Sequence, residues 1–187
     1  MPARIPRLAA LGSALALGLG LSACGNKESH PIRADSEGVY VDAGAVSYQV
    51  QISRQLNPYN VEDRSYLAGV SAAQPKPDQE WFGVFLWAKN ESHANQTTAS
   101  QFDIVDTQGT KYYPVPINTQ VNPFAWTPQT LKPLGIQPAP DSVASFGPTQ
   151  GAVLLFKLNT SVYSNRPLTL EIYAAGQAQP SSVSLDL

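Results

Sequence analysis

Apolar and polar residues alternate along much of this chain with the period of two that is typical of half-buried β-strands. The clearest case is residues 46–53, where Val46, Tyr48, Val50 and Ile52 alternate with Ser and Gln. Six more strands are predicted at residues 81–89, 102–104, 111–113, 152–158, 168–172 and 183–187, with a hairpin turn at residues 106–109. No window of helical length after the first 23 residues has a clean apolar period of 3.6 residues.

The strand at residues 81–89 is apolar on both faces. One face carries Phe82, Val84, Leu86 and Ala88, and the other carries Trp81, Gly83, Phe85 and Trp87. If the first face lies in the core, the second face would leave three large apolar side chains in water, which is unusual. Either another part of the chain covers them as a lid, or they bind a partner protein or a sugar polymer. Trp81, Phe85 and Trp87 are therefore the candidate binding face.

Residues 114–148 contain eight of the sixteen prolines in the chain. Proline lacks the N–H group that a sheet ladder or a helix requires, so this segment is expected to be a long irregular crossover with at most one helical turn. Its Phe124 and Trp126 make it the candidate lid over the aromatic strand. Seven short strands with proline and glycine between them indicate an all-β fold, an antiparallel β-sandwich.

The first 23 residues have the order of a secretory signal peptide. Arg4 and Arg7 precede an apolar or small-residue run from Leu8 to Leu21, and the only cysteine, Cys24, follows Leu-Ser-Ala. This arrangement resembles a bacterial lipoprotein signal, in which the cysteine thiol is acylated and cleavage leaves Cys24 first. Secretion with a chance cysteine is the main alternative. A spanning helix is a weaker one, because it needs about 20 apolar residues.

The predicted organisation is a signal peptide at residues 1–23, a flexible tether at residues 24–37 and one β-sandwich domain at residues 38–187. Removing the signal takes away Arg4 and Arg7 and leaves 10 basic side chains against 14 acidic ones. A mildly acidic chain without a basic cluster does not fit nucleic acid, which binds clustered Lys and Arg. The membrane is expected to be contacted through the lipid on Cys24.

Three stretches resemble a known group of domains: residues 88–92, residues 102–106 with the glycine turn that follows, and Gly151 leading into residues 153–156. They are similar to the immunoglobulin-like extracytoplasmic domains of unknown function on many Gram-positive, especially actinobacterial, lipoproteins. That group is similar in fold to a secreted mycobacterial immunoprotective antigen. Over residues 40–187, the resemblance implies an immunoglobulin-like sandwich of about seven strands at the cell surface, without catalytic residues.

The sequence offers little support for catalysis or for a metal. The two histidines, His30 in the expected tether and His93 in a loop, do not supply the three or four converging ligands of a zinc site. The nearest acidic pairs are Glu62 with Asp63 and Asp103 with Asp106, and they are interpreted as surface acids. No catalytic residue, metal or cofactor is predicted.

The function expected from these features is that of a non-enzymatic binding or accessory module. It would be fixed by a palmitate-type lipid on Cys24 to the extracytoplasmic side of the cell membrane, with an envelope protein or a glycan as its partner. The alternative is an envelope hydrolase that acts on glycan or peptide through carboxylates brought together only by the fold.

Overall fold

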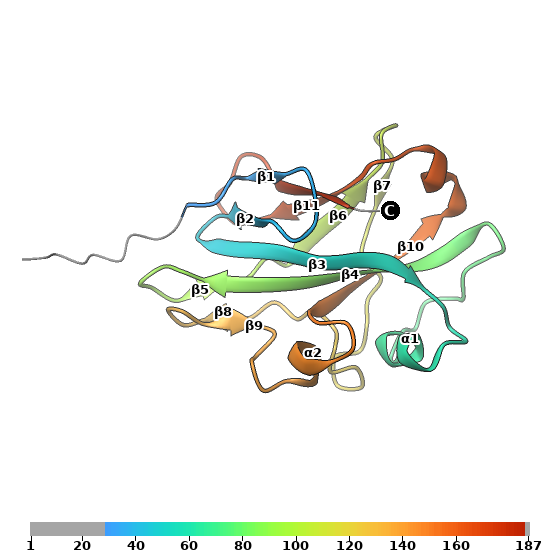
Figure 1. The fold of residues 1–187 in the computed structure, drawn as a ribbon, viewed down its shortest axis with the longest axis horizontal. Helices are drawn as coiled ribbons and strands as arrows, with labels where there is room; N and C mark the ends of the chain where they lie inside the picture. The colour runs from blue at the N-terminus through green and yellow to red at the C-terminus, as the bar shows by residue number, and fades with distance from the viewer. Residues whose placement is uncertain (1–28, 186–187) are drawn as a thin grey trace, which may run out of the picture.

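The computed structural model describes residues 29–185, and two β-sheets packed face to face dominate it (Figure 1). The first sheet has the strand order β1-β12-β11-β6-β7 and contains β1 (Arg33–Ala34), β6 (Gln101–Val105), β7 (Lys111–Tyr112), β11 (Leu168–Tyr173) and β12 (Ser181–Leu185). The second has the order β10-β4-β3-β2 with β9 paired to β4, and contains β2 (Tyr40–Ala43), β3 (Val46–Leu56), β4 (Gln79–Asn90), β9 (Ile136–Gln137) and β10 (Ala152–Asn159). The remaining elements are β5 (Gln96–Thr97), β8 (Thr130–Leu131), α1 (Val61–Tyr66), α2 (Val143–Phe146) and the 3-10 helix η1 (Thr160–Ser164).

The β-sandwich predicted from the alternation is confirmed. All seven predicted strands are present as β3, β4, β6, β7, β10, β11 and β12, and α2 is the single helical turn expected within residues 114–148. The sequence missed β1, β2, β5, β8 and β9, which are only two to four residues long and too short to display alternation. β1 pairs with β12 in parallel, so the sandwich is not purely antiparallel.

The inner core lies between the two sheets. From β4 it takes the predicted face, Phe82, Val84, Leu86 and Ala88, all 2% exposed or less. The first sheet contributes alternate residues of β6, β11 and β12, namely Phe102, Ile104, Leu168, Leu170, Ile172, Val183 and Leu185. Burying a large apolar side chain stabilises a fold by about 1.5–3 kcal/mol, so this layer holds the two sheets together.

A β-bulge changes the phase of β3. Val46, Tyr48 and Val50 face the inner core as predicted, but the pairing with β4 shifts between Val50 and Ile52, which leaves Gln51 as the extra residue. Ile52 therefore lies opposite Phe85, on the other face of the sheet, and is 40% exposed. The expectation that Ile52 continues the buried series is wrong for this reason.

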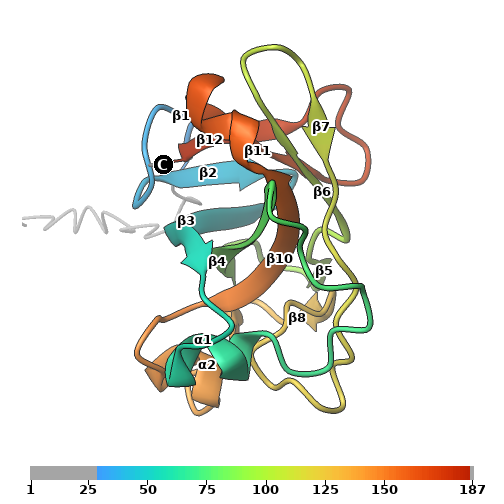
Figure 2. The ribbon, with the colours of Figure 1, turned by 90° about the vertical axis from the view of Figure 1, so that its right-hand side faces the viewer.

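A second layer of apolar residues, the outer core, covers the opposite face of the second sheet. Its buried members are Leu56, Tyr66, Trp81, Phe85, Val153 and Leu155. They are covered by partly buried residues from two connections, Leu67, Val70 and Ala72 after α1, and Val115, Ile117 and Phe124 from the proline-rich segment. Figure 2 shows α1 and α2 on this side of the sheet, away from β11 and β12. Connecting segments thus form a third layer.

Phe124 and Trp126 of the proline-rich segment lie on different sides of the second sheet. Phe124 packs in the outer core, with its ring centroid 5.0 Å from that of Tyr66. Trp126 belongs to the inner core, where its ring lies 5.6 Å from Phe102 and its Nε1 donates to the carbonyl of Ala99 at 3.0 Å. The expectation that both residues form the lid is therefore correct for Phe124 and wrong for Trp126.

The domain begins earlier than residue 38. The backbone N–H of His30 donates to Asp42 Oδ2 at 3.1 Å, and the carbonyl of Pro31 accepts from the N–H of Asp42 at 2.9 Å. Ala34 in β1 is 7% exposed and pairs with Val183. Residues 30–37, predicted to be part of a flexible tether, are thus an edge of the sandwich. The segment has one large apolar side chain, Ile32, which is 56% exposed, so backbone hydrogen bonds and the small buried side chain of Ala34 hold it to the sandwich.

Candidate functional site

The structure separates the three residues of the candidate binding face. Trp81 is 2% exposed and Phe85 is fully buried, and both lie in the outer core. Trp87 is half-buried further along β4, opposite Gln49. These three side chains therefore do not form an open platform, because the connections after α1 and after β7 cover the first two. That prediction is corrected.

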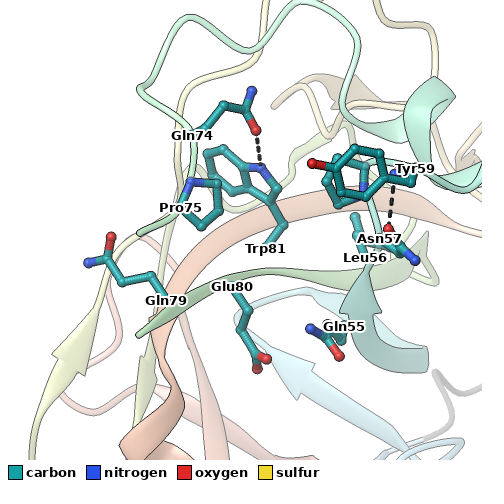
Figure 3. Close-up of a pocket in the computed structure, with 10 residues that line it drawn as sticks. Gln55, Leu56, Asn57, Tyr59, Gln74, Pro75, Gln79, Glu80 and Trp81 are labelled. Atoms are coloured by element: carbon teal, nitrogen blue, oxygen red, sulfur yellow. Dashed lines mark hydrogen bonds between the residues drawn. The ribbon is translucent and has the colours of Figure 1, made fainter. Parts of the chain in front are cut away.

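Trp81 instead contributes to the wall of a cavity of about 460 Å³ at the end of the sandwich (Figure 3). The cavity lies where β3 ends and β4 begins, since Leu56 pairs with Trp81. We call it the Tyr59–Trp81 pocket, and its lining residues are Gln55, Leu56, Asn57, Pro58, Tyr59, Gln74, Pro75, Gln79, Glu80 and Trp81. Its volume lies within the range of about 300–1,000 Å³ that is usual for small-molecule sites.

The turn between β3 and α1 holds Tyr59 at the rim of the pocket. The Asn57 side chain closes an Asx-turn, in which Oδ1 accepts from the Tyr59 N–H at 2.9 Å. The Asn57 N–H in turn donates to Asp63 Oδ2 at 2.7 Å, and the other Asp63 oxygen lies 2.7 Å from Arg54 Nη1. Asn60 caps α1. Tyr59 is 91% exposed, so its ring extends into solvent from a turn whose backbone is held by hydrogen bonds.

The opposite wall comes from the loop that precedes β4. Trp81 Nε1 donates to Gln74 Oε1 at 3.3 Å, and Figure 3 shows Gln74 and Pro75 beside the indole ring. Gln79 Oε1 accepts from the backbone N–H of Lys76 at 3.3 Å and its Nε2 donates to Asn159 Oδ1 at 3.3 Å. Hydrogen bonds at both ends of the loop therefore fix the indole and the carboxamides around the cavity.

Within the part of the chain that the structure describes, Glu80 is the only acidic residue that lines the pocket. Its carboxylate is 6% exposed and accepts from the Tyr163 hydroxyl, with both oxygens 3.0 Å away. Burial raises the pKa of Glu80, and the hydrogen bond from Tyr163 opposes that rise. In Figure 3 the side chain points to the other side of β4 from Trp81. Glu80 is thus engaged in the fold and does not face a second carboxylate in the cavity.

No protein-family model matches the sequence, and no curated protein does. Among solved structures, the chain is similar to the YjhA protein from Bacillus subtilis, with 11% identity and a TM-score of 0.48 over 81% of this chain and 99% of that one. It is also similar to YcdA from Bacillus subtilis, provisionally described as a lipoprotein, with 13% identity and a TM-score of 0.45 over 79% of this chain and 38% of that one. An uncharacterised β-sandwich protein from Clostridium difficile has 11% identity and a TM-score of 0.43 over 86% and 99% of the two chains.

All three proteins are bacterial, and a likeness at these values carries no assignment of function. The actinobacterial origin and the similarity to the mycobacterial antigen stay predictions.

Two carboxylate pairs from distant parts of the chain meet in the fold: Asp42 and Glu91 both contact Ser47 and His30, and a second pair lies on the outer face of the first sheet. Asp103 and Glu171 lie opposite each other in β6 and β11, and Lys111 Nζ contacts an oxygen of each at 2.9 Å. The Tyr173 hydroxyl also donates to both. Burial raises the pKa of Asp103, whereas hydrogen bonds from Tyr173 and Lys111 outweigh burial at Glu171 and lower its pKa. The positive charge of Lys111 compensates the negative charge of the two carboxylates, as in a structural ion-pair network.

The acidic pairs named from the sequence have structural roles. Glu62 and Asp63 both contact Arg54, which ties α1 to β3. Asp106 does not join Asp103, because it faces the hairpin turn and accepts from the N–H groups of Gln108 and Thr110 at 2.9 Å. Burial would raise the pKa of Asp106, but these N–H donors outweigh it and lower the pKa.

The remaining predicted residues do not form a site. Cys24 lies outside the described residues, so its lipid stays a prediction. His93 is exposed in the loop after β4, whereas His30 packs against Tyr40 with its Nδ1 3.6 Å from Asp42 Oδ1. Within residues 29–185, no three His, Cys, Asp or Glu side chains are grouped so that they could hold a metal. In the same range, no helix has the length and apolar character needed to cross a membrane.

Sequence reasoning missed most of the pocket. Asn57, Tyr59, Gln74 and Gln79 are not among the candidate site residues predicted from the sequence. The sequence does carry one signal. Four carboxamide residues lie near the end of β3 and the start of β4, and the pairing of Leu56 with Trp81 brings these two strand ends together. That signal requires the pairing of β3 with β4, which the sequence alone does not supply.

Proposed function

We propose that this protein is a non-enzymatic binding module, fixed by a lipid on Cys24 to the extracytoplasmic side of the cell membrane, and that it binds its partner in the Tyr59–Trp81 pocket. The observation that carries the proposal is the chemistry of the lining. It combines aromatic rings, prolines and carboxamides with a single carboxylate that already accepts from Tyr163. Such groups bind and orient a ligand, whereas hydrolysis requires a second acid or a nucleophile with its base.

The position of the pocket agrees with this role. His30 is bonded to Asp42, which pairs with Ser47 near the start of β3, and the pocket lies at the end of that strand. The strand rises about 3.3 Å per residue, so Leu56 lies about 30 Å from Ser47. The six residues from Cys24 to His30 span at most about 22 Å. An anchor at Cys24 therefore holds the domain near the membrane, with the pocket at the far end.

The anchor is tested by metabolic labelling with an alkyne analogue of palmitate, comparing the wild-type chain with Cys24→Ala in the same cells. We expect label on the wild-type chain, a mature N-terminus at Cys24 by mass spectrometry, and no label on the variant. Label that persists in Cys24→Ala, or a mature chain that starts elsewhere without lipid, contradicts the anchor.

The binding role is tested by placing a photo-crosslinking amino acid at position 59 of the full chain in intact cells. The matched control is position 113, because Tyr113 is 64% exposed and does not line the pocket. We expect an adduct from position 59 and none from position 113. Equal adducts at both positions, or none at position 59, contradict binding through the pocket.

The second candidate function is the envelope hydrolase, and the pairing of Asp103 with Glu171 is the observation that favours it. Lys111 bridges the two acids, whereas a glycosidase leaves room for the sugar between them. Release of sugar or peptide from purified envelopes by the wild-type chain, but not by Glu171→Gln, would establish the hydrolase in place of the binding module.

A further inference from the structure

The structure also indicates what kind of ligand the Tyr59–Trp81 pocket would take. We infer that it binds a short, uncharged glycan segment. This inference rests on the proposed function, since it names the ligand class for the same pocket. It is argued from the hydrogen-bonding groups that the lining leaves open, from the absence of a cation in the lining, and from the Tyr59 ring.

The open hydrogen-bonding groups are carboxamides. Asn57 and Gln74 each use their side-chain oxygen within the fold, to Tyr59 N–H and Trp81 Nε1–H respectively. Their NH2 groups are then left as donors at the cavity, since a carboxamide has two donors in addition to its acceptor oxygen. Gln55 does not add to them, because it pairs with Phe82 and Figure 3 shows its side chain on the side of Glu80, away from Trp81. Between Tyr59 and Trp81 the pocket thus presents carboxamide donors together with the Tyr59 hydroxyl, which can donate and accept.

This set of groups fits hydroxyl, ring and acetamido oxygens better than a peptide. An extended peptide backbone carries one N–H donor for each carbonyl acceptor, so its N–H groups would find few acceptors here. A sugar hydroxyl both donates and accepts and can turn its hydrogen to suit the neighbour. Burying polar groups without partners is unfavourable, which favours the glycan over the peptide.

The lining also argues against a charged ligand. Phosphate, sulfate and carboxylate groups are bound in proteins through Arg, Lys or dense N–H clusters. Among residues 29–185, neither Arg nor Lys lines the pocket. The nearby Lys157, with Nζ 5.0 Å from the Trp81 ring centroid, already donates to the carbonyl of Ala73. An uncharged ligand needs no such cation.

Tyr59 supplies the apolar contact that a sugar ring requires. Its ring is 91% exposed on a backbone that Asn57 and Asp63 hold in place, so little entropy is lost when a ligand covers it. A pyranose has one face of C–H groups, and an exposed aromatic ring is a flat apolar surface of matching shape. Pro58 and Pro75 extend the same apolar surface within the lining.

The inference is tested by titrating the purified full-length protein in detergent with chitotetraose, maltotetraose and mannotetraose, and following binding by calorimetry and tryptophan fluorescence. An oligogalacturonate and a proline-rich peptide serve as the charged and peptide probes. We expect saturable binding of at least one neutral glycan, no binding of the charged glycan or the peptide, and a loss of at least tenfold in affinity in Tyr59→Ala. Tyr113→Ala should bind as the wild type does.

The variants keep the test specific to the pocket. Tyr59 is almost fully exposed, so Tyr59→Ala should melt within a few degrees of the wild type, and its loss of binding cannot come from unfolding. Gln55→Ala, also exposed but on the other face of the sheet from Trp81, should bind within about twofold of the wild type. If no neutral glycan binds while position 59 still crosslinks to an envelope protein, the glycan inference fails and the binding module stands. If neither experiment gives a signal, the binding module fails as well.

Discussion

The second sheet carries two cores, one on each face, and they are built in different ways. The inner core is strand against strand, with Phe82 of β4 facing the other sheet. The outer core is strand against connection, with Phe85 of the same strand covered by α1 and the proline-rich segment. Regular strands satisfy their own backbone groups, whereas an irregular cover must find a partner for each N–H and carbonyl. The outer core therefore depends on polar side chains that hold its irregular cover.

Two asparagines show how that dependence is met. Asn122, 1% exposed, donates to the carbonyls of Tyr66 and Ala68 at 2.8 and 3.0 Å and accepts from the N–H of Phe124. Asn90 plays a similar part on the inner-core face of β4, opposite Val46, where it is fully buried and donates to the carbonyl of Leu131 at 2.9 Å. Each side chain ties the crossover to a part of the chain far from it in sequence. An apolar layer made by connections thus remains in place through a few buried amides.

The largest effect that separates the two cores is expected from Phe85→Ala. Removing a fully buried phenylalanine leaves a cavity and should lower the free energy of unfolding by about 3–5 kcal/mol. Hydrogen exchange distinguishes the outer core from the inner core. Phe85→Ala should accelerate the exchange of backbone amides in α1 and in residues 115–126 more than in β11. Urea unfolding gives the overall loss.

Phe82→Ala is the matched control, since Phe82 is equally buried on the other face of the strand. Phe82→Ala should lower the free energy of unfolding by a similar amount, but it should also accelerate the exchange of amides in β11 and β12. Should the two variants give the same exchange pattern, the two cores unfold as one unit and the distinction between them fails.

A smaller effect is expected from Asn122→Ala. The substitution removes the partners of two carbonyls and of one N–H, all near the outer core. Buried polar groups left without partners cost about 1–3 kcal/mol, so a loss of about 2–3 kcal/mol is expected by urea unfolding. Faster exchange should be confined to residues around Tyr66 and Phe124.

Asn165→Ala is a suitable control for Asn122→Ala, because its side chain makes a single long hydrogen bond of 3.4 Å to Asp106 Oδ2 on the other sheet. We expect it to lose less than about 1 kcal/mol. An Asn122→Ala variant as stable as this control would mean that apolar packing alone holds the cover.

The sequence predicts the inner core better than the outer core for a physical reason. Alternation places Phe82, Leu86 and Ile104 correctly, because a strand fixes the direction of each side chain from its neighbours. The bulge at Gln51 breaks that rule, and Ile52 is misplaced as a result. The outer core needs contacts between α1, β4 and residues 115–124, which no local pattern specifies.

The candidate site follows the same division. The aromatic face of β4 is visible in the sequence, and so is the need for something to cover it. Which side of the sheet Phe124 and Trp126 reach is not, because each residue of an irregular segment can turn either way. The amides of the pocket lie on two loops whose proximity depends on the register of β3 with β4. The early start of the domain at His30 was likewise hidden, because backbone hydrogen bonds leave no apolar pattern.

The smallest of the three effects is expected from Tyr48→Phe in the inner core. Tyr48 is 1% exposed, and its hydroxyl oxygen accepts from the N–H of Ala99 at 2.6 Å. At pH 7 the variant should lose about 1–2 kcal/mol in the free energy of unfolding, because that N–H loses its partner. The inner core therefore has polar anchors of its own, since the Tyr48 hydroxyl and the Trp126 indole N–H both bond the backbone of Ala99, and this limits the contrast between the two cores.

The same residue gives the inner core a dependence on alkaline pH. Burial raises the pKa of Tyr48 to about 12, against about 10 in an unfolded chain, although the Ala99 N–H opposes the rise. Its stabilising contribution is complete below pH 10 and is lost as pH rises toward 12, since only the unfolded chain then ionises. Burial also raises the pKa of Tyr173 to about 12. In urea unfolding between pH 9 and 11.5, the free energy of unfolding of Tyr48→Phe should fall less steeply with pH than that of the wild type. The two slopes should differ by at most about 1.4 kcal/mol per pH unit. Parallel slopes for the two proteins would show that Tyr48 ionises as easily in the fold as in water, and that the inner core admits solvent at this position.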